Sequence, residues 1–202
     1  MLRWFLYTIL AVAVLLTGQR MWVYHQIYHY AEYEAGAMAA GASEKEAKTT
    51  IVAFVDYTSR FSREINPVIL QAVHDNPGIR VVFHPLPQPS KIPMRTARVA
   101  LAAGLQDKFL PVHEALMRNE KPLTDEYIRE LAAQNGMDAD KFLADIDGNE
   151  TAVLLYKSAQ ASAAMKVYAT PAFIFNRKHL YIPEQSIPNI VEFNQILKEA
   201  QS

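Results

Sequence analysis

The stretch that decides the fold is residues 51–64, IVAFVDYTSRFSRE. It begins with an apolar run typical of a buried strand and passes directly into a segment whose apolar residues have helical spacing. Serine is a favoured helix N-cap, so Ser59 is expected to open the helix. Ser62 then falls in the first helical turn, where we expect it close to solvent. The sequence therefore predicts a strand that turns straight into a helix bearing two hydroxyls at its N-terminus.

Composition limits the function classes. The chain has 202 residues, half of them apolar, which is enough for one or two domains with a sizeable core. Its net charge of -1 provides no field that would attract nucleic acid, so no nucleic-acid partner is expected. The absence of cysteine excludes disulfides, thiolate nucleophiles and cysteine metal sites. We expect no cofactor and no metal.

The N-terminus is expected to associate with a membrane, because residues 4–18 carry no charge. A helix of this length spans about 22 Å, less than the ~30 Å hydrocarbon core, so it fits a short anchor or a signal peptide. We favour an anchor over residues 1–24, because no small-x-small cleavage site follows and the helix can continue past Arg20. Arg3 favours a cytoplasmic N-terminus, which predicts a single-pass protein of a bacterial inner membrane with its body in the periplasm.

Residues 25–48 are expected to form an interfacial helix followed by a linker or a short helix. The aromatic residues that begin at Trp22 suit a membrane interface, and residues 22–48 offer a possible contact between two copies of the chain. His25 and His29 stand four residues apart with Glu32 close by, but a third and a fourth metal ligand are not evident. We therefore interpret them as part of the interfacial helix.

The remaining sequence predicts a small sheet that is split by a helical insertion. A strand, a helix and a strand come first, which requires a parallel pair joined by a crossover. A block of helices follows at about residues 92–166, and then two strands joined by a short turn and a last helix. The expected elements are strands at 49–57, 79–83, 172–176 and 178–182, and helices at 59–75, 94–105, 108–118, 124–135, 138–145, 150–165 and 187–200.

This order and its local sequence resemble the DsbA family of thioredoxin-fold proteins over about residues 49–201. The matching stretches are FVDYTSRFSREINPVI at 54–69, RVVFHPLP at 80–87, ARVALAAGLQDKFLPVHEALM at 97–117 and VYATPAFIFN at 167–176. The resemblance implies an α/β thioredoxin-like fold, β-α-β then β-β-α, with an inserted helical domain inside residues 49–202. It also implies a cis-proline at Thr170-Pro171.

The chain departs from the family at Ser59 and Ser62, which stand where the family has two cysteines. In the family, the helix N-terminus stabilises a thiolate that exchanges disulfides. A serine hydroxyl is too weak an acid for that role, so the chain is not a thiol-disulfide oxidoreductase, and we lean against any enzymatic activity.

Two enzymatic alternatives use Ser59. Kappa-class glutathione transferases resemble the DsbA family and hold the glutathione thiolate with a serine at this position. Against this alternative, Arg60 and Phe61 replace the usual neighbours and an anchor is foreign to that class. A hydrolase triad of Ser59, His84 and Asp56 is set aside, because no oxyanion loop is visible. Asp56 is instead expected to accept hydrogen bonds at the turn.

Protein binding needs no thiol. In the family, the cis-proline loop offers backbone groups to an extended peptide, and this chain can retain that contact by strand addition. We therefore expect a non-catalytic scaffold, assembly factor or subunit of an envelope complex, of the secretion or conjugation type, with a periplasmic holdase chaperone as an alternative. The candidate partner-binding residues are Ser59, Arg60, Phe61, Ser62, Thr170 and Pro171.

Overall fold

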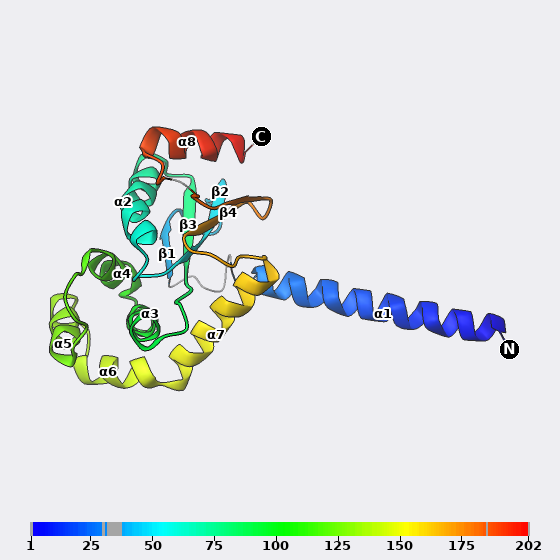
Figure 1. Ribbon diagram of the computed structural model, residues 1–202, viewed down its shortest axis with the longest axis horizontal. Helices are drawn as coiled ribbons and strands as arrows, with labels where there is room; N and C mark the ends of the chain where they lie inside the picture. The colour runs from blue at the N-terminus through cyan, green and yellow to red at the C-terminus, as the bar shows by residue number, and fades with distance from the viewer. Residues whose placement is uncertain (1, 30, 32–37, 185, 202) are drawn as a thin grey trace.

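The computed structural model describes residues 2–29, 31, 38–184 and 186–201, and the side chains of residues 2–11 lie outside this description. This part of the chain forms a sheet covered by helices, and one long N-terminal helix extends away from the body (Figure 1). The elements, in chain order, are α1 (Leu2–His29), β1 (Ala39–Gly41), β2 (Thr49–Val55), α2 (Arg60–Asp75), β3 (Ile79–Pro85), α3 (Lys91–Gly104), α4 (Phe109–Arg118), α5 (Asp125–Gln134), α6 (Ala139–Asp147), α7 (Asn149–Ala164), β4 (Ala172–Phe175), β5 (His179–Tyr181) and α8 (Ile190–Glu199).

The sheet has the strand order β1-β3-β2-β4-β5. The strands β2 and β3 are parallel and are joined by α2, as the crossover argument predicted. The strand β4 pairs antiparallel with β2, and β5 pairs antiparallel with β4. Asn176 and Arg177, at the β4–β5 turn, have positive φ angles of 47° and 63°. Two positive φ values at the centre of a two-residue turn match the twist of a hairpin.

The strand β1 is a correction to the sequence prediction of a linker or short helix before residue 48. Residues 39–41 pair antiparallel with β3 and form one edge of the sheet. Gly41 has a φ angle of 88°, and a Cβ atom there would stand 2.2 Å from the Ile79 carbonyl oxygen. Only glycine fits this close approach. Residues 30 and 32–37, which include Glu32 and part of the predicted copy-to-copy contact at 22–48, lie outside the described residues.

The two faces of the sheet bury different side chains of β2. Ile51, Ala53 and Val55 belong to the larger core cluster, which also holds buried residues of α2 and α8. Val52 and Phe54 belong to a second cluster with the C-terminal end of α7. This alternation is the period-two pattern of a strand buried on both faces. The C-terminal end of α1 packs on the second cluster, so α1 is attached to the body on that side.

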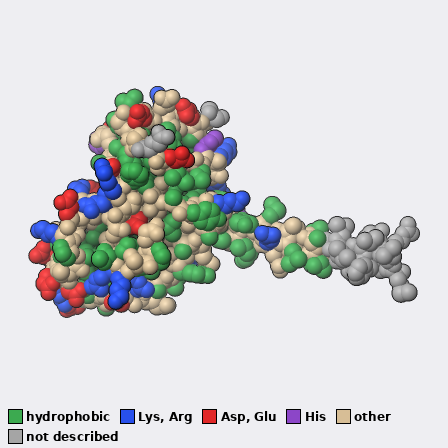
Figure 2. Space-filling model, in the orientation of Figure 1, with side chains coloured by type: hydrophobic (Ala, Val, Ile, Leu, Met, Phe, Trp, Pro, Cys, Tyr) green, Lys and Arg blue, Asp and Glu red, His purple; other side chains and the backbone are tan. Residues whose placement is uncertain are grey.

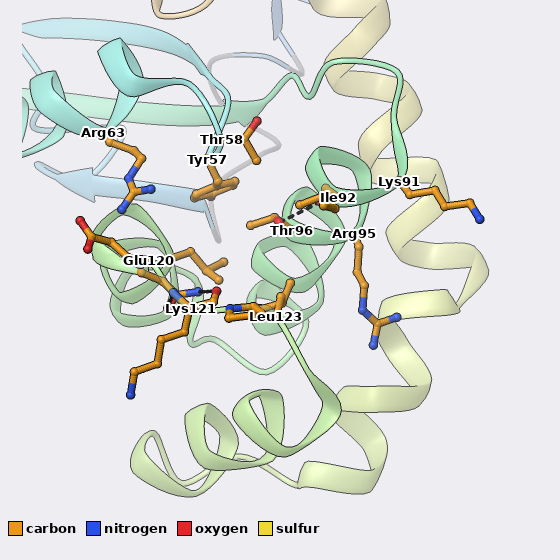
Figure 3. Close-up of a pocket in the computed structure, with 13 residues that line it drawn as sticks. Tyr57, Thr58, Arg63, Lys91, Ile92, Arg95, Thr96, Glu120, Lys121 and Leu123 are labelled. Atoms are coloured by element: carbon orange, nitrogen blue, oxygen red, sulfur yellow. Dashed lines mark hydrogen bonds between the residues drawn. The ribbon is translucent and has the colours of Figure 1, made fainter.

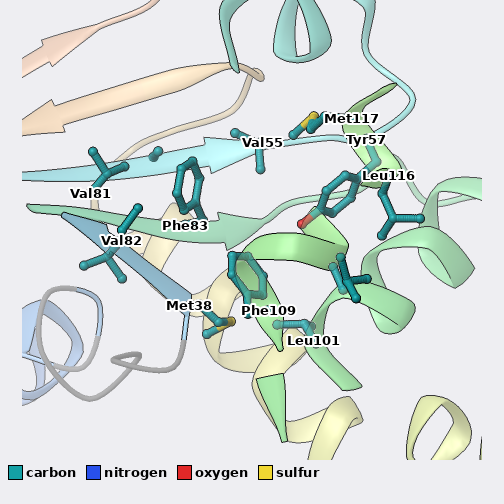
Figure 4. Packing of buried hydrophobic residues seen from close by; sticks show 14 of the residues in the cluster. Met38, Val55, Tyr57, Val81, Val82, Phe83, Leu101, Phe109, Leu116 and Met117 are labelled. Atoms are coloured by element: carbon teal, nitrogen blue, oxygen red, sulfur yellow. The ribbon is translucent and has the colours of Figure 1, made fainter. Parts of the chain in front are cut away.

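The inserted helices α3–α7 lie between β3 and β4 in the chain and share the larger core with the sheet. Phe83 of β3 lies 6.1 Å from Phe109 of α4, measured between ring centroids. Leu101 of α3 and Leu116 of α4 are buried in the same cluster (Figure 4). The insertion is therefore joined to the sheet by a continuous apolar core.

Within the described residues, no helix is both long enough and apolar enough to cross a membrane. The expected anchor at residues 1–24 includes eleven residues whose side chains are outside the description. The described part of α1 exposes Leu15, Met21 and Trp22, each with more than half of its surface in solvent, and Figure 2 shows apolar side chains along this helix.

Candidate functional site

The junction between β2 and α2 places Ser59 as the N-cap of α2, as predicted. Its backbone is extended, with φ -75° and ψ 123°, and its Oγ accepts a hydrogen bond from the Ser62 N–H at 3.4 Å. The first turn of α2 contains no acidic residue. Ser59 therefore satisfies one of the otherwise unpaired N–H groups of the helix start.

Ser62 is completely buried, so the expectation that it lies close to solvent is wrong. Its Oγ accepts a hydrogen bond from the Asp56 N–H at 3.2 Å. The helix returns over the end of β2, and this packing covers the side chain at the third helical position. Ser62 thus fastens the start of α2 to the end of the strand.

Asp56 acts as the hydrogen-bond acceptor of the turn, as expected. Its Oδ1 accepts from the Thr58 N–H and the Thr58 hydroxyl, each at 2.8 Å, and its Oδ2 accepts from the Gln88 N–H at 3.1 Å. The carboxylate is almost fully buried and joins the β2–α2 turn to the segment after β3. Both carboxylate oxygens of Asp56 therefore stabilise the contact between the β2–α2 turn and the segment after β3.

His84 does not join Ser59 and Asp56 in a triad. It is buried in the face of the sheet that packs against α7, with Nδ1 3.2 Å from the Ser158 Oγ and Nε2 2.9 Å from the Ala31 carbonyl oxygen. Burial lowers the pKa of His84 from 6.5 to about 4, although the hydrogen bond with Ala31 opposes this shift. His84 therefore connects the segment after α1 to the body.

Arg60 and Phe61 present the exposed part of the junction. The Arg60 guanidinium is 84% exposed and pairs with Glu64, with 2.5 Å between Nε and Oε1. Because the pair is exposed to solvent, which screens it, it adds little to the stability of the helix. Phe61 is 37% exposed, so an aromatic ring stands at the surface beside the N-terminus of α2.

The predicted cis peptide bond at Thr170-Pro171 is present. The antiparallel register of β4 on β2 sets Ala172 opposite Phe54, so Pro171 comes next to the last residues of β2. The cis-proline loop and the start of α2 therefore lie at the same end of the sheet. Sequence reasoning missed Tyr168, which precedes this loop and is 81% exposed. An aromatic residue two positions before the Thr170-Pro171 motif was the sequence signal that could have found it.

A buried polar cluster lies behind the junction. The Tyr57 hydroxyl is 2.9 Å from His113 Nδ1, and His113 Nε2 is 2.8 Å from Asn66 Oδ1. A neutral ring that donates from Nε2 to Asn66 accepts at Nδ1 from Tyr57. Burial, together with the positive charge of Arg118, lowers the pKa of His113 from 6.5 to about 3. Burial raises the pKa of Tyr57, so both groups are uncharged at neutral pH.

A cleft with a volume of about 480 Å³ opens beside the junction, and sequence reasoning did not foresee it. Its walls come from the turn after β2, from α2, from the start of α3 and from the loop between α4 and α5 (Figure 3). Among its basic lining residues, Arg63 belongs to α2, Arg95 to α3, and Lys121 to the loop (Figure 3). The lining residues are Tyr57, Thr58, Arg63, Lys91, Ile92, Arg95, Thr96, Leu116, Asn119, Glu120, Lys121, Pro122 and Leu123.

Ser59 has an exposed neighbour in Phe61 and a basic cleft beside it, but the chain contains no thiol, so the two hydroxyls cannot form or exchange a disulfide. Among the described residues, no group of three or more histidine, aspartate or glutamate side chains is placed to hold a metal ion.

The strand order, the cis-proline and the helical insertion define a thioredoxin-fold protein whose two redox positions carry serine. The chain belongs to the DSBA-like thioredoxin domain family, whose model matches residues 50–193.

Solved structures show the same fold at low identity. The thiol-disulfide exchange protein alpha-DsbA2 from Wolbachia pipientis has a TM-score of 0.72 and 21% identity, over 88% of this chain and 94% of that one. The catalytic domain of Proteus mirabilis ScsC has a TM-score of 0.70 and 20% identity, over 86% and 94%. A periplasmic thioredoxin-like protein from Salmonella enterica serovar Typhimurium has a TM-score of 0.66 and 25% identity, over 86% and 95%.

The curated relatives are much longer than this chain. A protein named Na(+)/H(+) antiporter NhaA 1, from Salinispora arenicola, is 26% identical over 138 residues. The match covers 67% of this chain and 21% of that protein, so the chain spans about a fifth of the length of the curated relatives it matches. The antiporter activity in their names is therefore not transferred to this chain.

Proposed function

We propose that the chain is a non-catalytic, membrane-anchored DsbA-like protein that binds protein partners through the surface around Ser59. It acts as a scaffold, an assembly factor or a subunit of an envelope complex, such as a secretion or conjugation apparatus. The observation that carries this proposal is the use of both hydroxyls inside the fold. Ser59 caps α2 and Ser62 accepts the Asp56 N–H, so the redox positions keep a structural role without redox chemistry.

The surface around these hydroxyls supports partner binding. Phe61 and Tyr168 expose aromatic rings, and large rings of this kind are common anchors at protein interfaces. The Thr170-Pro171 loop stands at the same end of the sheet, where its backbone can pair with an extended segment. These features come from two separate parts of the chain, the start of α2 and residues 168–171, and they lie at the same end of the sheet.

Photocrosslinking tests this surface directly. Benzoylphenylalanine in place of Phe61 or Tyr168, in cells with intact membranes, is expected to give discrete adducts with another protein. Val191 of α8 is 74% exposed and lies outside the proposed surface, so benzoylphenylalanine there is the matched control. Equal labelling at Val191, or no adduct at Phe61 and Tyr168, contradicts the proposal. An adduct of twice the chain mass identifies a second copy of the chain as the partner at this surface.

The anchor and the periplasmic location form part of the same proposal. The uncharged run at residues 4–18 lies within the continuous helix α1, and one structural neighbour is described as periplasmic. We expect the chain to stay with membranes after alkaline extraction and its body to be digested by protease added to spheroplasts. Release by alkali, or protection from the protease, contradicts the anchor or the orientation respectively.

Calorimetry with reduced glutathione separates this proposal from the transferase alternative. We expect no heat of binding, because the Ser59 Oγ serves as the helix cap. Binding that disappears in Ser59→Ala would overturn the non-catalytic assignment.

A further inference from the structure

The cleft beside α2 concentrates positive charge in a chain whose net charge is only -1. Four of its lining residues are basic and one, Glu120, is acidic. Arg95 is paired with Asp125, and the Arg63 Nε donates to the Met117 carbonyl oxygen at 2.9 Å. Lys91 and Lys121 have no ion pair within the part of the chain that the structure describes. Their two ammonium groups are the charges left for a ligand.

The helix ends that border the cleft add to this positive potential. The helix α3 starts at Lys91, its N-cap Ser90 makes no side-chain capping bond, and its first turn holds no acidic residue. The start of α2 is also without an acidic residue. A helix N-terminus carries a partial positive charge, and here no carboxylate of the same helix turn offsets it. The start of α3 therefore reinforces the attraction for carboxylates, whereas the buried Asp56 carboxylate lies in the turn that leads into α2.

The floor of the cleft is apolar. Leu116 and the ring of Tyr57 are buried beneath it, and Pro122 and Leu123 form one side. Ile92, in the first turn of α3, is 71% exposed at its rim. A ligand that covers Ile92 removes apolar surface from water, which a lone inorganic anion cannot do.

The loop that forms one wall is held by its own hydrogen bonds. The Asn119 amide donates to the Lys121 carbonyl oxygen at 2.8 Å, and its Oδ1 accepts from the Lys121 N–H at 3.0 Å. Because the wall is already ordered, the loop loses less conformational entropy when a ligand binds.

We propose that this cleft binds an acidic linear segment of a protein partner, in which carboxylate side chains flank one or two large apolar side chains. The carboxylates pair with Lys91 and Lys121, and the apolar side chain lies against Ile92 and Leu123. This inference rests on the proposed partner-binding function and names the chemistry of the partner.

Fluorescence anisotropy with full-length protein in a neutral detergent tests the assignment. The probe is a dye-labelled hexapeptide, Glu-Glu-Leu-Phe-Glu-Glu, with blocked ends. In one matched probe, lysine replaces all four glutamates. In the other, Ser-Ser replaces the central Leu-Phe. We expect the first probe to bind at least about tenfold more tightly than either matched probe, and its affinity to fall with added salt.

Charge reversal locates the binding. The double variant Lys91→Glu with Lys121→Glu is expected to bind the Glu-Glu-Leu-Phe-Glu-Glu probe about tenfold or more weakly, because two attractive contacts become repulsive. The double variant Lys45→Glu with Lys178→Glu changes the net charge equally at exposed sites away from the cleft, and should leave affinity within about twofold. Circular dichroism confirms that both variants fold. No binding, equal binding of the three probes, or equal weakening by both variants overturns the proposal.

Crosslinking distinguishes this inference from the proposed function. Partner adducts from position 61 that persist in the Lys91→Glu, Lys121→Glu variant leave the function standing and refute the cleft. If the probe binds in the cleft but no partner adduct forms, the proposed partner binding around Ser59 is refuted and the assignment of the cleft is supported.

Discussion

Acidification from pH 7 to pH 5 is expected to destabilise the fold through two buried histidines. His84 and His113 are both fully buried, with pKa values lowered from 6.5 to about 4 and about 3. In the folded chain both imidazoles stay neutral at pH 5, whereas the same groups in the unfolded chain take up protons below pH 6.5. The unfolded state then binds more protons than the folded state. The stability that the two neutral histidines contribute is therefore fully present above the unfolded pKa of 6.5, and it is lost as the pH falls toward their folded pKa values.

The magnitude follows from the two pKa values. At pH 5, a group with an unfolded pKa of 6.5 favours unfolding by about 2 kcal/mol relative to pH 7, provided that its folded pKa is 4 or below. The two histidines together therefore lower the free energy of unfolding by about 4 kcal/mol between pH 7 and pH 5. This is a large fraction of the roughly 5–15 kcal/mol that holds a domain folded.

The assay is urea unfolding of the full-length chain at pH 7 and pH 5, compared with His113→Gln. The glutamine amide can replace both hydrogen bonds, to Tyr57 and to Asn66, but it does not titrate. We expect the variant to lose about half of the pH effect, about 2 kcal/mol. His179 is exposed on β5, so His179→Gln is the matched control and should keep the full effect.

One result would refute the reasoning. If His113→Gln and the unmodified chain lose the same free energy between pH 7 and pH 5, His113 is not held neutral by burial. Contributions from carboxylates are common to both proteins and cancel in this difference.

Three further predictions concern the junction. Ser62→Ala removes the acceptor of the buried Asp56 N–H and should cost about 1–3 kcal/mol in urea unfolding; a cost below that of Ser59→Ala would contradict the burial of Ser62. Ser59→Ala loses only the helix cap, so we expect a cost of about 1 kcal/mol, restored by Ser59→Asp, and no recovery in Ser59→Asp would argue against capping. The double change Ser59→Cys with Ser62→Cys should form an intramolecular disulfide, detected by mass spectrometry and absent from the Ser59→Cys single variant; failure to form it would show that the two positions do not meet disulfide geometry.

Much of the fold was predictable because its signals are local. The apolar run before Asp56 and the helical spacing after Ser59 predicted β2 and α2, since each depends on neighbours only a few residues away. The turn at Asn176 and Arg177 was also predicted, because a two-residue turn between strand patterns is read from adjacent residues. The strand β1 was missed because its sequence, Ala-Ala-Gly, has no strand character and depends on pairing with β3.

The candidate site was predicted less completely, because several of its features join distant parts of the chain. The cap at Ser59 was predicted because it depends on an N–H only three residues away. The other contacts are between residues far apart in the sequence. The contact of Tyr57 with His113 spans 56 residues, and that of His113 with Asn66 spans 47. The basic cleft likewise joins α2, α3 and the loop after α4. A pattern of neighbouring residues carries no information about such contacts.

The sequence by itself determined that this chain has no thiol chemistry, because the residue types at positions 59 and 62 set the acidity of the groups there. It also determined the strand-to-helix junction, through period and capping. Only the tertiary structure decided that Ser62 is buried, that Asp56 and His113 hold separate segments together, and that four basic side chains surround one cleft. The physical reason is that burial and electrostatic potential depend on which segments pack together, and packing is a property of the whole fold.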